Sequence, residues 1–426
     1  MFKERLDRQL RIEGWEQSVL EETRVGVVGD NDLLASMFVM SASALGLNNM
    51  VVLAPRLDRR LVEIARRVNP ELDLVVIEGF YVHALMEDLF DGCKVIVDLS
   101  RYAMANKLLL EKGFKEGIPV MRGFCYEQDG EEGLEAFTYT RGREWQEIER
   151  IVSPHNLPVE HFDDGVFDII ASGIILEETK NLLMGRKTSG SIITYGRKKT
   201  ARAANGANIC VIGAGALGNF VGLGLAFSGF RNITFMDPDL IETVNLNRQV
   251  LFYDAVGSSK SEALSARLNE LFGTSARARA EYFRRETDVS AYDVIFDCTD
   301  NFETRIIISE KCEELRKKLI SGGTNVEKGQ VVIYDPMRSS GTPAQVLGFY
   351  DIVDKRKIEM YRRERAACIY RPDPSVIMSN QIIAGLMVDS CKILLDGREP
   401  ANIFYDSTSE RMIRVETLIE PVEPVQ

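Results

Sequence analysis

The chain contains one series of sequence segments twice, in the same order. The first pair is Arg24–Gly29 and Asn208–Gly213, two apolar runs that end in glycine and precede an apolar helical stretch. The other pairs are GLNNMVVLAP with SGFRNITFMDP, CKVIVDLSRYAMANKLLL with YDVIFDCTDNFETRIII, IPVMRGFCYEQDGEEG with KLISGGTNVEKGQ, and DIIASGIILEETKNLLMG with SNQIIAGLMVDSCKILLDG. Single matches arise by chance, but five in register predict a duplicated fold.

Each copy alternates predicted strands with predicted helices. Runs of Val and Ile bounded by Gly and Asp are typical of a parallel sheet buried on both faces. Such βαβ units predict an α/β chain made of two tandem doubly wound, Rossmann-like domains. We expect the first domain at 1–187, a polar, basic linker at 188–202 and the second domain at 203–426, which ends in two short strands joined by a polar turn.

Charge and hydropathy exclude two kinds of partner. The formal net charge of −12 argues against nucleic-acid binding, which needs clustered basic residues. We interpret the local run Arg197-Lys198-Lys199, with Arg202, as a solvated linker. No apolar run approaches the length of a membrane span, and the charged, amphipathic N-terminus is unlike a signal peptide.

The cysteines and histidines predict no structural metal. Seven cysteines are dispersed with no CxxC pair, which is typical of reduced thiols and predicts a cytoplasmic location. The three histidines are not spaced with other metal ligands, so we expect no structural zinc.

A glycine-rich loop in the second copy predicts a nucleotide site. Gly213, Gly215 and Gly218 form GxGxxG between a predicted strand and a predicted helix, where glycines allow a phosphate to approach the backbone and the helix N-terminus. Asp237 follows the next predicted strand, where a carboxylate can bind a ribose hydroxyl. A turn or helix-cap role is the alternative for Asp237.

The first copy has a different loop at this position. Only Gly29 remains, and the loop continues with Asp30, Asn31 and Asp32. Carboxylates repel a triphosphate. The ribose position holds Ala54 or Pro55, so we expect this copy to bind no nucleotide and to act as a structural partner.

Three segments of the second copy carry a specific resemblance. MDPDLIETVNLNRQVLF, VGSSKSEAL and DCTDNFETR closely resemble the ThiF/MoeB/E1 adenylating family, and the likeness extends from about Ile209 to Leu395. The N-terminal LDRQLRIEGWEQSVL resembles the opening helix of that family. A degenerate copy before an intact one resembles the inactive and active adenylation halves of a ubiquitin-type E1, which implies a pseudo-dimer within one chain. A further homodimer stays open.

The resemblance implies adenylation of a carboxylate. In the family, the C-terminal carboxylate of a small ubiquitin-like (β-grasp) protein ending in glycine attacks the α-phosphate of ATP, and pyrophosphate leaves. The carboxylate, with a pKa of about 3.5, is already ionised and needs no general base. Catalysis then consists of positioning, cations and Mg²⁺.

The resemblance also assigns roles to individual residues. Arg248 matches a phosphate-binding arginine, Lys260 a cation near the phosphates, Asp300 the Mg²⁺ ligand and Asp237 the ribose ligand. The implied nucleotide contacts further include Gly213, Gly215, Ala216, Gly218, Asp239, Asn245 and Asn301. Surface ion pairs are the alternative for Arg248 and Lys260. For Asp297 we favour a structural role at a strand end.

Arg8 lies in the opening segment. In dimeric relatives this arginine crosses into the active site of the neighbouring subunit, and here the first copy can take the neighbour's place. We therefore predict that Arg8 reaches phosphates bound by the second copy. No DRQ-like segment precedes the second copy, which fits one site per chain. A solvated helix face is the alternative.

Cys368 lies in an expected crossover segment at 338–370, a position that resembles the thioester-forming cysteine of compact single-module E1 enzymes. The nearby Arg362, Arg363, Arg365 and Arg371 would favour a thiolate. A buried apolar cysteine is the alternative. If Cys368 forms a thioester, an E2-like protein is a possible acceptor. We interpret the other cysteines as structural.

Three other functions remain open. ThiF/MoeB-like adenylation of a sulfur carrier or a ribosomal peptide needs no thioester, although the zinc-binding CxxC pairs common in MoeB and ThiF are absent. GxGxxG with Asp237 would also suit an NAD-dependent oxidoreductase, which has no need of Arg248, Lys260 and Asp300. A non-catalytic scaffold fits the first copy but not the second.

Overall fold

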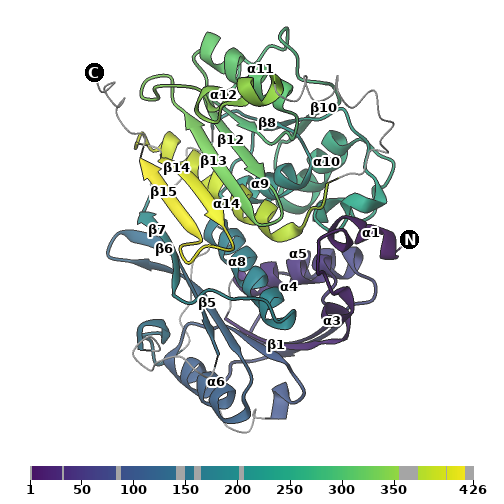
Figure 1. Ribbon diagram of the computed structural model, residues 1–426, viewed down its shortest axis with the longest axis vertical. Helices are drawn as coiled ribbons and strands as arrows, with labels where there is room; N and C mark the ends of the chain where they lie inside the picture. The colour runs from purple at the N-terminus through teal and green to yellow at the C-terminus, as the bar shows by residue number, and fades with distance from the viewer. Residues whose placement is uncertain are drawn as a thin grey trace.

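The chain folds into two halves, each built around one β-sheet (Figure 1). The computed structural model describes residues 2–30, 33–82, 88–140, 149–157, 165–200, 206–354, 373–399 and 401–417. The first half occupies the lower part of Figure 1 and the second half the upper part, and the N-terminal helices lie at the boundary between them.

The strands of the first half are β1 (Arg24–Gly29), β2 (Asn49–Ala54), β3 (Asp73–Glu78), β4 (Val95–Leu99), β5 (Val120–Gln128), β6 (Glu131–Tyr139) and β7 (Ile193–Lys198). Its helices are α1 (Phe2–Arg5), α2 (Asp7–Leu10), α3 (Gln17–Glu22), α4 (Leu33–Leu45), α5 (Arg59–Val68), α6 (Ala103–Glu116) and α8 (Val166–Leu183).

The strands of the second half are β8 (Ile209–Ile212), β9 (Ile233–Met236), β10 (Arg277–Arg279), β11 (Val294–Asp297), β12 (Lys318–Thr324), β13 (Lys328–Tyr334), β14 (Ala401–Asp406) and β15 (Ile413–Thr417). Its helices are α9 (Ala216–Phe227), α10 (Lys260–Phe272), α11 (Phe302–Glu314), α12 (Pro343–Val346) and α14 (Ile377–Leu395), with the 3-10 turns η2 (Thr243–Asn245) and η3 (Val250–Phe252).

The two sheets share the order of seven strands, and the second sheet has an eighth at its end, β15. The first has the order β3-β2-β1-β4-β5-β6-β7 and the second the order β10-β9-β8-β11-β12-β13-β14-β15. In both, the first five strands pair in parallel and the later ones are antiparallel. The predicted duplication of a doubly wound α/β unit is therefore confirmed, as are the two short strands predicted after residue 400.

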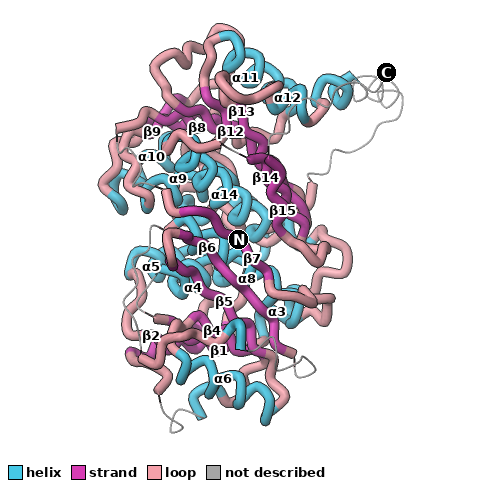
Figure 2. The backbone as a smooth tube through the Cα atoms, turned by 90° about the vertical axis from the view of Figure 1, so that its left-hand side faces the viewer, coloured by secondary structure: helices cyan, strands magenta, loops and turns pink. Residues whose placement is uncertain are grey.

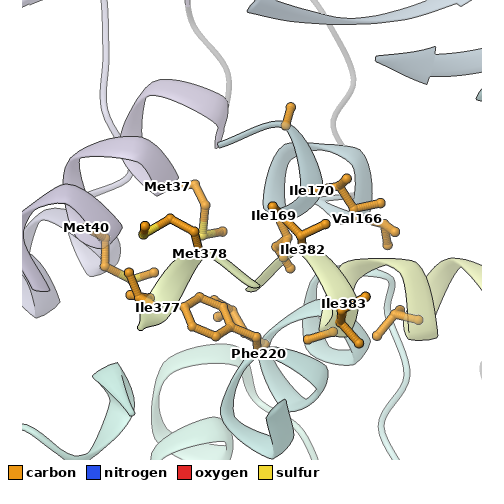
Figure 3. Packing of buried hydrophobic residues seen from close by; sticks show 14 of the residues in the cluster. Met37, Met40, Val166, Ile169, Ile170, Phe220, Ile377, Met378, Ile382 and Ile383 are labelled. Carbon is orange, nitrogen blue, oxygen red and sulfur yellow. The ribbon is translucent and has the colours of Figure 1, made fainter. Parts of the chain in front are cut away.

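A shared helical core joins the halves. Helices α4 and α8 of the first half and α9 and α14 of the second contribute to one continuous cluster of buried apolar residues. Figure 3 shows Ile169 and Ile170 of α8 beside Ile382 of α14, with Phe220 of α9 close to them. In Figure 2 these helices follow one another between the strands of the two halves. The halves therefore pack as a pseudo-dimer.

Close helix packing depends on glycines in the core. A Cβ on Gly173 of α8 would lie 2.7 Å from Cγ1 of Ile382, and a Cβ on Gly385 of α14 would lie 2.5 Å from Cγ1 of Ile170. Real Cβ atoms do not approach carbon this closely, so these positions need glycine for the helices to meet.

Part of the predicted linker is wrong. Residues 188–202 include β7, which pairs with β6 and completes the first sheet. Arg197 of β7 is not solvated: its guanidinium pairs with Glu132 of β6 and with the fully buried Asp389 of α14. The hydroxyl of Tyr195 donates to the same Asp389 at 2.7 Å. This segment therefore locks the first sheet to the second half, because the buried Asp389 carboxylate needs donors.

The structure also tests the expectation about membranes. Within the described part of the chain, no helix combines the length and the apolar character that a membrane span requires.

Candidate nucleotide site

The glycine loop follows β8 and holds its shape through two glycines. Gly213 has a φ of +96°, which favours glycine, and a Cβ there would stand 2.6 Å from the carbonyl oxygen of Cys298. A Cβ on Gly218 would stand 2.1 Å from the carbonyl oxygen of Gly213. Gly215 differs, since the nearest atom to its Cβ position is Nε2 of Gln249 at 3.8 Å. The open space beside Gly215 leaves room for a ligand.

Helix α9 begins directly at this loop. Its N-cap residue is Gly215, so no side chain caps the first turn from that position. The Asn219 side chain donates to the carbonyl oxygens of Ala214 and Gly215 and accepts from the Leu251 N–H, which ties the loop to η3. An uncapped helix N-terminus with open space before it is suited to an anion.

Asp237 lies at the end of β9 next to the loop. It is 6% exposed, and its two oxygens accept from the N–H groups of Ala214 at 2.7 Å and Asp239 at 2.8 Å. Burial raises the pKa of the Asp237 carboxyl, and the nearby Lys260 opposes this rise. A carboxylate can accept about four hydrogen bonds, so Asp237 retains capacity for a ribose hydroxyl. Lys260 pairs with Asp239 at 2.8 Å.

Arg248 lies between η2 and η3, on the segment that packs against the glycine loop. Its Nη1 donates to the Val244 carbonyl at 2.9 Å and to Oδ1 of Asn247 at 2.8 Å. In the described residues, no carboxylate lies within 4 Å of this guanidinium. Burial and the nearby charge of Arg8 lower the pKa of Arg248 to about 10, while Asp300 opposes the change. The site therefore holds a buried cation without an adjacent counter-ion.

Arg8 reaches the same place from the first half. It lies on α2, and its charge is near enough to lower the pKa of Arg248. Its Nη1 donates to the Asp373 carbonyl at 2.7 Å, before α14, and its buried Nε has no hydrogen-bond partner among the residues that the structure describes. The neighbours of the two arginines are in contact, since Nδ2 of Asn247, next to Arg248, donates to Oε1 of Gln9, next to Arg8, at 3.1 Å. That Arg8 acts on phosphates bound by the second half stays a prediction.

Asp300, Asn301 and Asn245 are also near the site but differ in their bonding. Asp300 is an exposed carboxylate just after β11. Asn301 caps α11 by accepting from the Thr304 N–H, and Asn245 accepts from the Glu242 N–H, so both support local turns. No cluster of three metal-binding side chains occurs among the residues that the structure describes. A single carboxylate fits Mg²⁺ that is held mainly by phosphates and water.

Asp297 has the structural role favoured from the sequence. It is buried at the end of β11 and accepts from Arg305 Nε at 3.0 Å and from the Ser321 hydroxyl at 2.7 Å. In the first half, the equivalent buried carboxylate is Asp98 of β4, and its ion-pair partner is Arg122, the residue opposite it on β5. Nη1 of Arg122 lies 3.7 Å from Oδ1 of Asp98. The same buried carboxylate therefore pairs with a helix arginine in one copy and a strand arginine in the other.

The first half differs in charge at two positions of the loop region: it has a carboxylate where the second half has a neutral alanine, and an arginine where the second half has an aspartate. Asp30 follows Gly29 where Ala214 follows Gly213, and its Oδ2 accepts from the Arg101 N–H at 2.5 Å. Arg101 follows Asp98 by three residues, as Asp300 follows Asp297. A carboxylate thus stands beside the degenerate loop, and a cation replaces the candidate magnesium ligand. This arrangement supports the prediction that only the second half binds a nucleotide.

Three polar residues that the sequence reasoning missed hold the site together. They are Gln9, Asn219 and Asn247, each with no exposed surface. Gln9 directly follows Arg8, and Asn247 directly precedes Arg248. This position next to two predicted site residues is the sequence signal that could have identified them.

Cys368 lies outside the described residues. The other six cysteines are all buried. Burial raises the pKa of the Cys210 thiol to about 12 and also raises the pKa values of Cys298, Cys312 and Cys391. These thiols are therefore poor nucleophiles, which agrees with their predicted structural roles.

The fold and the glycine loop define a protein of the doubly wound, nucleotide-binding type. Comparison with known proteins gives the family: the model of the ThiF family matches residues 189–419, more than half of the chain. The chain belongs to the ThiF family, which confirms the resemblance found in its sequence.

The names of the curated relatives describe adenylyltransferases. "Adenylyltransferase and sulfurtransferase MOCS3" of Aedes aegypti is 28% identical over 182 residues, covering 41% of this chain and 39% of that protein. "Adenylyltransferase and sulfurtransferase uba4" of Aspergillus terreus is 37% identical over 141 residues, covering 32% of this chain and 29% of that protein. The matched region thus spans less than half of either relative.

Solved structures of E. coli MccB are also similar. The complex of MccB with ATP is 22% identical, with a TM-score of 0.42, and the match covers 52% of this chain and 67% of MccB.

Proposed function

We propose that this protein is an ATP-dependent adenylyltransferase that activates the C-terminal carboxylate of a small ubiquitin-like protein. The observation that carries the proposal is the contact of the opening segment with the second half beside the glycine loop, where Nδ2 of Asn247, next to Arg248, donates to Oε1 of Gln9, next to Arg8, at 3.1 Å. Arg248 is 7% exposed, and among the described residues its guanidinium is bonded only to neutral acceptors; a buried cation of this kind is costly unless an anion binds to it. A triphosphate at the N-terminus of α9 would supply that anion.

The reaction needs positioning more than acid–base chemistry. An oxygen of the partner's carboxylate attacks the α-phosphorus of ATP and forms a new P–O bond. The bond from that phosphorus to the bridging oxygen breaks, and pyrophosphate leaves with the electron pair. Arg8, Arg248 and Lys260 would stabilise the charge that develops on the phosphates, while Asp237 would hold the ribose.

Mg²⁺ has one candidate protein ligand in this site, Asp300. When bound, the ion would neutralise charge on the phosphates. Lys260 pairs with Asp239, and a bound phosphate would compete with that carboxylate for the ammonium group.

The finer part of the proposal is a thioester at Cys368. The thiolate would attack the acyl carbon of the adenylate, forming a C–S bond while the bond to the AMP oxygen breaks and AMP leaves. An E2-like protein would then accept the acyl group. The support for this step is the sequence position of Cys368 and its neighbouring arginines.

The second candidate substrate is a sulfur-carrier protein activated without a thioester. The names of the MOCS3 and uba4 relatives, which pair adenylyltransferase with sulfurtransferase, favour it. Both candidates share the adenylation step and differ only in the fate of the adenylate.

Pyrophosphate exchange tests the shared step. With candidate proteins ending in Gly-Gly, the wild-type chain should catalyse exchange of labelled pyrophosphate into ATP, and Arg8→Ala should reduce the rate at least a hundredfold. Arg11→Ala is the matched control, because Arg11 lies on the next turn and pairs with Asp7 on the surface. Exchange that survives Arg8→Ala, or no ATP binding by the wild type, would contradict the proposal.

A thiol-sensitivity assay separates the two candidates. A ubiquitin-like substrate should give an ATP-dependent adduct that thiols cleave and that Cys368→Ala abolishes, with exchange retained. Exchange without any adduct on Cys368 would favour the sulfur-carrier candidate.

A further inference from the structure

A buried amide from the opening segment contacts the second half. Gln9 of α2 has no exposed surface. Its Nε2 donates to the Leu45 carbonyl at 2.8 Å and to Oε1 of Gln17 at 2.7 Å. These two acceptors fix which end of the amide is the donor, so Oε1 of Gln9 must point the other way.

The Gln9 oxygen then orients a second amide. Nδ2 of Asn247 donates to Oε1 of Gln9 at 3.1 Å, across the boundary between the halves. This contact leaves Oδ1 of Asn247 facing Nη1 of Arg248 at 2.8 Å. If the Asn247 amide were flipped, an NH₂ group would face the guanidinium, and two donors would oppose each other.

The hydrogen bonds from Leu45 through Gln9 and Asn247, called the relay below, end on Arg248. Arg248 is the buried cation that the proposed function assigns to the phosphates. Within the described residues, the Arg248 guanidinium is held by neutral acceptors, the Val244 carbonyl and the Asn247 amide. Neutral acceptors orient a guanidinium without cancelling its charge, which leaves that charge available to phosphates. A carboxylate in the place of Asn247 would orient it equally well but would compete with the nucleotide.

We infer that Gln9 is a positioning residue that sets the orientation of Arg248 for phosphate binding through Asn247. The inference rests on the proposed function and adds a second role for the first half. That half supplies Arg8. It also supplies the Leu45 carbonyl at the C-terminal end of α4, which accepts from Gln9 and thereby sets which end of each amide in the relay donates. The order runs from Leu45 to Gln9, Asn247 and Arg248.

The location of the opening segment agrees with this role. Helix α1 packs against η2, which lies just before Arg248, and the N-terminal helices lie at the boundary between the halves (Figure 1). The backbone of α2 itself is also bonded to the second half, since the Ser375 N–H donates to the Arg8 carbonyl at 3.3 Å. Gln9 is therefore held in place independently of Asn247.

The test compares two ligands by isothermal titration calorimetry on the full chain. Adenylyl imidodiphosphate with Mg²⁺ presents a triphosphate group to Arg248, and adenosine presents none. Gln9→Met keeps a similar side-chain length but removes both ends of the amide. It should weaken binding of the triphosphate analogue about tenfold, or about 1.4 kcal/mol, and leave adenosine binding unchanged.

Arg5→Met is the matched control. Arg5 lies in the same segment, is buried, and donates to the Ala44 carbonyl beside Leu45, whereas the side-chain hydrogen bonds of Asn247 among the described residues are with Gln9 and Arg248. Its substitution should leave the affinity for the triphosphate analogue unchanged. If Gln9→Met does not fold, Asn247→Ala carries the test, because it breaks the relay while Gln9 keeps its bonds to Leu45 and Gln17.

A double variant separates positioning from general support. In an Arg248→Met background, Gln9→Met should cause no further loss of affinity, because its effect acts through Arg248. Equal weakening of both ligands, or a further tenfold loss in that background, would overturn the inference. A wild-type chain that binds adenosine but gains nothing from the triphosphate would instead refute the proposed function.

Discussion

Two buried arginines of the second half should respond in opposite ways to removal of their charge. Arg305 pairs with the buried carboxylate of Asp297, whereas Arg248 has only the neutral acceptors Val244 and Asn247. Arg305→Met strands a buried carboxylate, which costs about 3–5 kcal/mol of the free energy of unfolding. Arg248→Met leaves no buried carboxylate without its ion-pair partner, because the acceptors of Arg248 are neutral.

The cost of burying the Arg248 charge follows from the lowering of its pKa. The lowering of its pKa to about 10 corresponds to a cost of about 3 kcal/mol, at about 1.4 kcal/mol for each tenfold change in proton affinity. The lowered pKa belongs to the folded state, so this cost is fully present below pH 10 and disappears as the pH rises toward the unfolded value. Methionine removes that cost and loses two hydrogen bonds of about 1 kcal/mol each. Arg248→Met should therefore be as stable as the wild type or about 1 kcal/mol more stable.

Ligand binding should show the opposite ranking. A charged hydrogen bond to phosphate contributes about 1.5–3 kcal/mol, so Arg248→Met should weaken binding of the magnesium complex of adenylyl imidodiphosphate about 10- to 100-fold. At 100 times the wild-type Kd, the analogue stabilises the wild type by about 2.7 kcal/mol. After a 100-fold loss the same concentration gives about 0.4 kcal/mol.

Thermal unfolding with and without the analogue measures both effects. The Tm of unliganded Arg248→Met should match or exceed that of the wild type, and the rise of Tm on adding the analogue should nearly vanish. Arg305→Met should unfold at a clearly lower temperature without ligand. A large loss of stability in Arg248→Met, together with a normal rise of Tm on binding, would refute the assignment of Arg248 as a cation kept for phosphate.

Three further substitutions test the frame of the site. Gly218→Ala should lower the Tm and abolish nucleotide binding, since its Cβ would lie 2.1 Å from the Gly213 carbonyl oxygen; an unchanged Tm would contradict the loop geometry. Asp389→Asn should cost about 3 kcal/mol in urea unfolding, because it leaves Arg197 buried with less counter-charge; a cost below 0.5 kcal/mol would show that the inter-half ion cluster adds little. Asp300→Asn should raise the Mg²⁺ concentration needed for half-maximal pyrophosphate exchange several-fold, and an unchanged Mg²⁺ dependence would remove Asp300 as the metal ligand.

The sequence allowed much of the fold to be predicted because its signals are local. Duplicated strand–helix pairs gave the two sheets, and the spacing of GxGxxG and Asp237 located the loop and the neighbouring strand end. These features depend on residues a few positions apart, whose spacing is fixed by the strand and the helix that carry them.

Strand β7 was missed because its surroundings come from distant segments. The basic residues after Tyr195 resemble a solvated run, but Arg197 lies against Asp389, almost two hundred residues away in the chain. One local signal was available: Ile193 and Tyr195 recur as Ile403 and Tyr405 in the equivalent strand β14, again two residues apart and buried. The duplication was therefore a better guide to this segment than its charge.

The relay through Gln9 was beyond sequence reasoning for a related reason. A buried amide gives no pattern in a sequence, and its importance depends on which groups face its two ends. The contact between Gln9 and Asn247 joins residues 238 positions apart. Only the packed pseudo-dimer brings them together, although both stand next to arginines that the sequence did single out.

The charge pattern explains why a duplicated chain would keep a single site. A nucleotide site in the first half would need an arginine reaching in from an opening segment of the second half, and the sequence before β8 has no such segment. Without that cation, a phosphate at the first loop would meet the carboxylate of Asp30, which instead accepts from the Arg101 N–H. Under the proposed function, the opening segment of the first half serves the site of the other half. On this reasoning, the double substitution Asp30→Ala and Arg101→Asp would not create a second site. An arginine equivalent to Arg8 would still be missing, because no DRQ-like segment precedes β8.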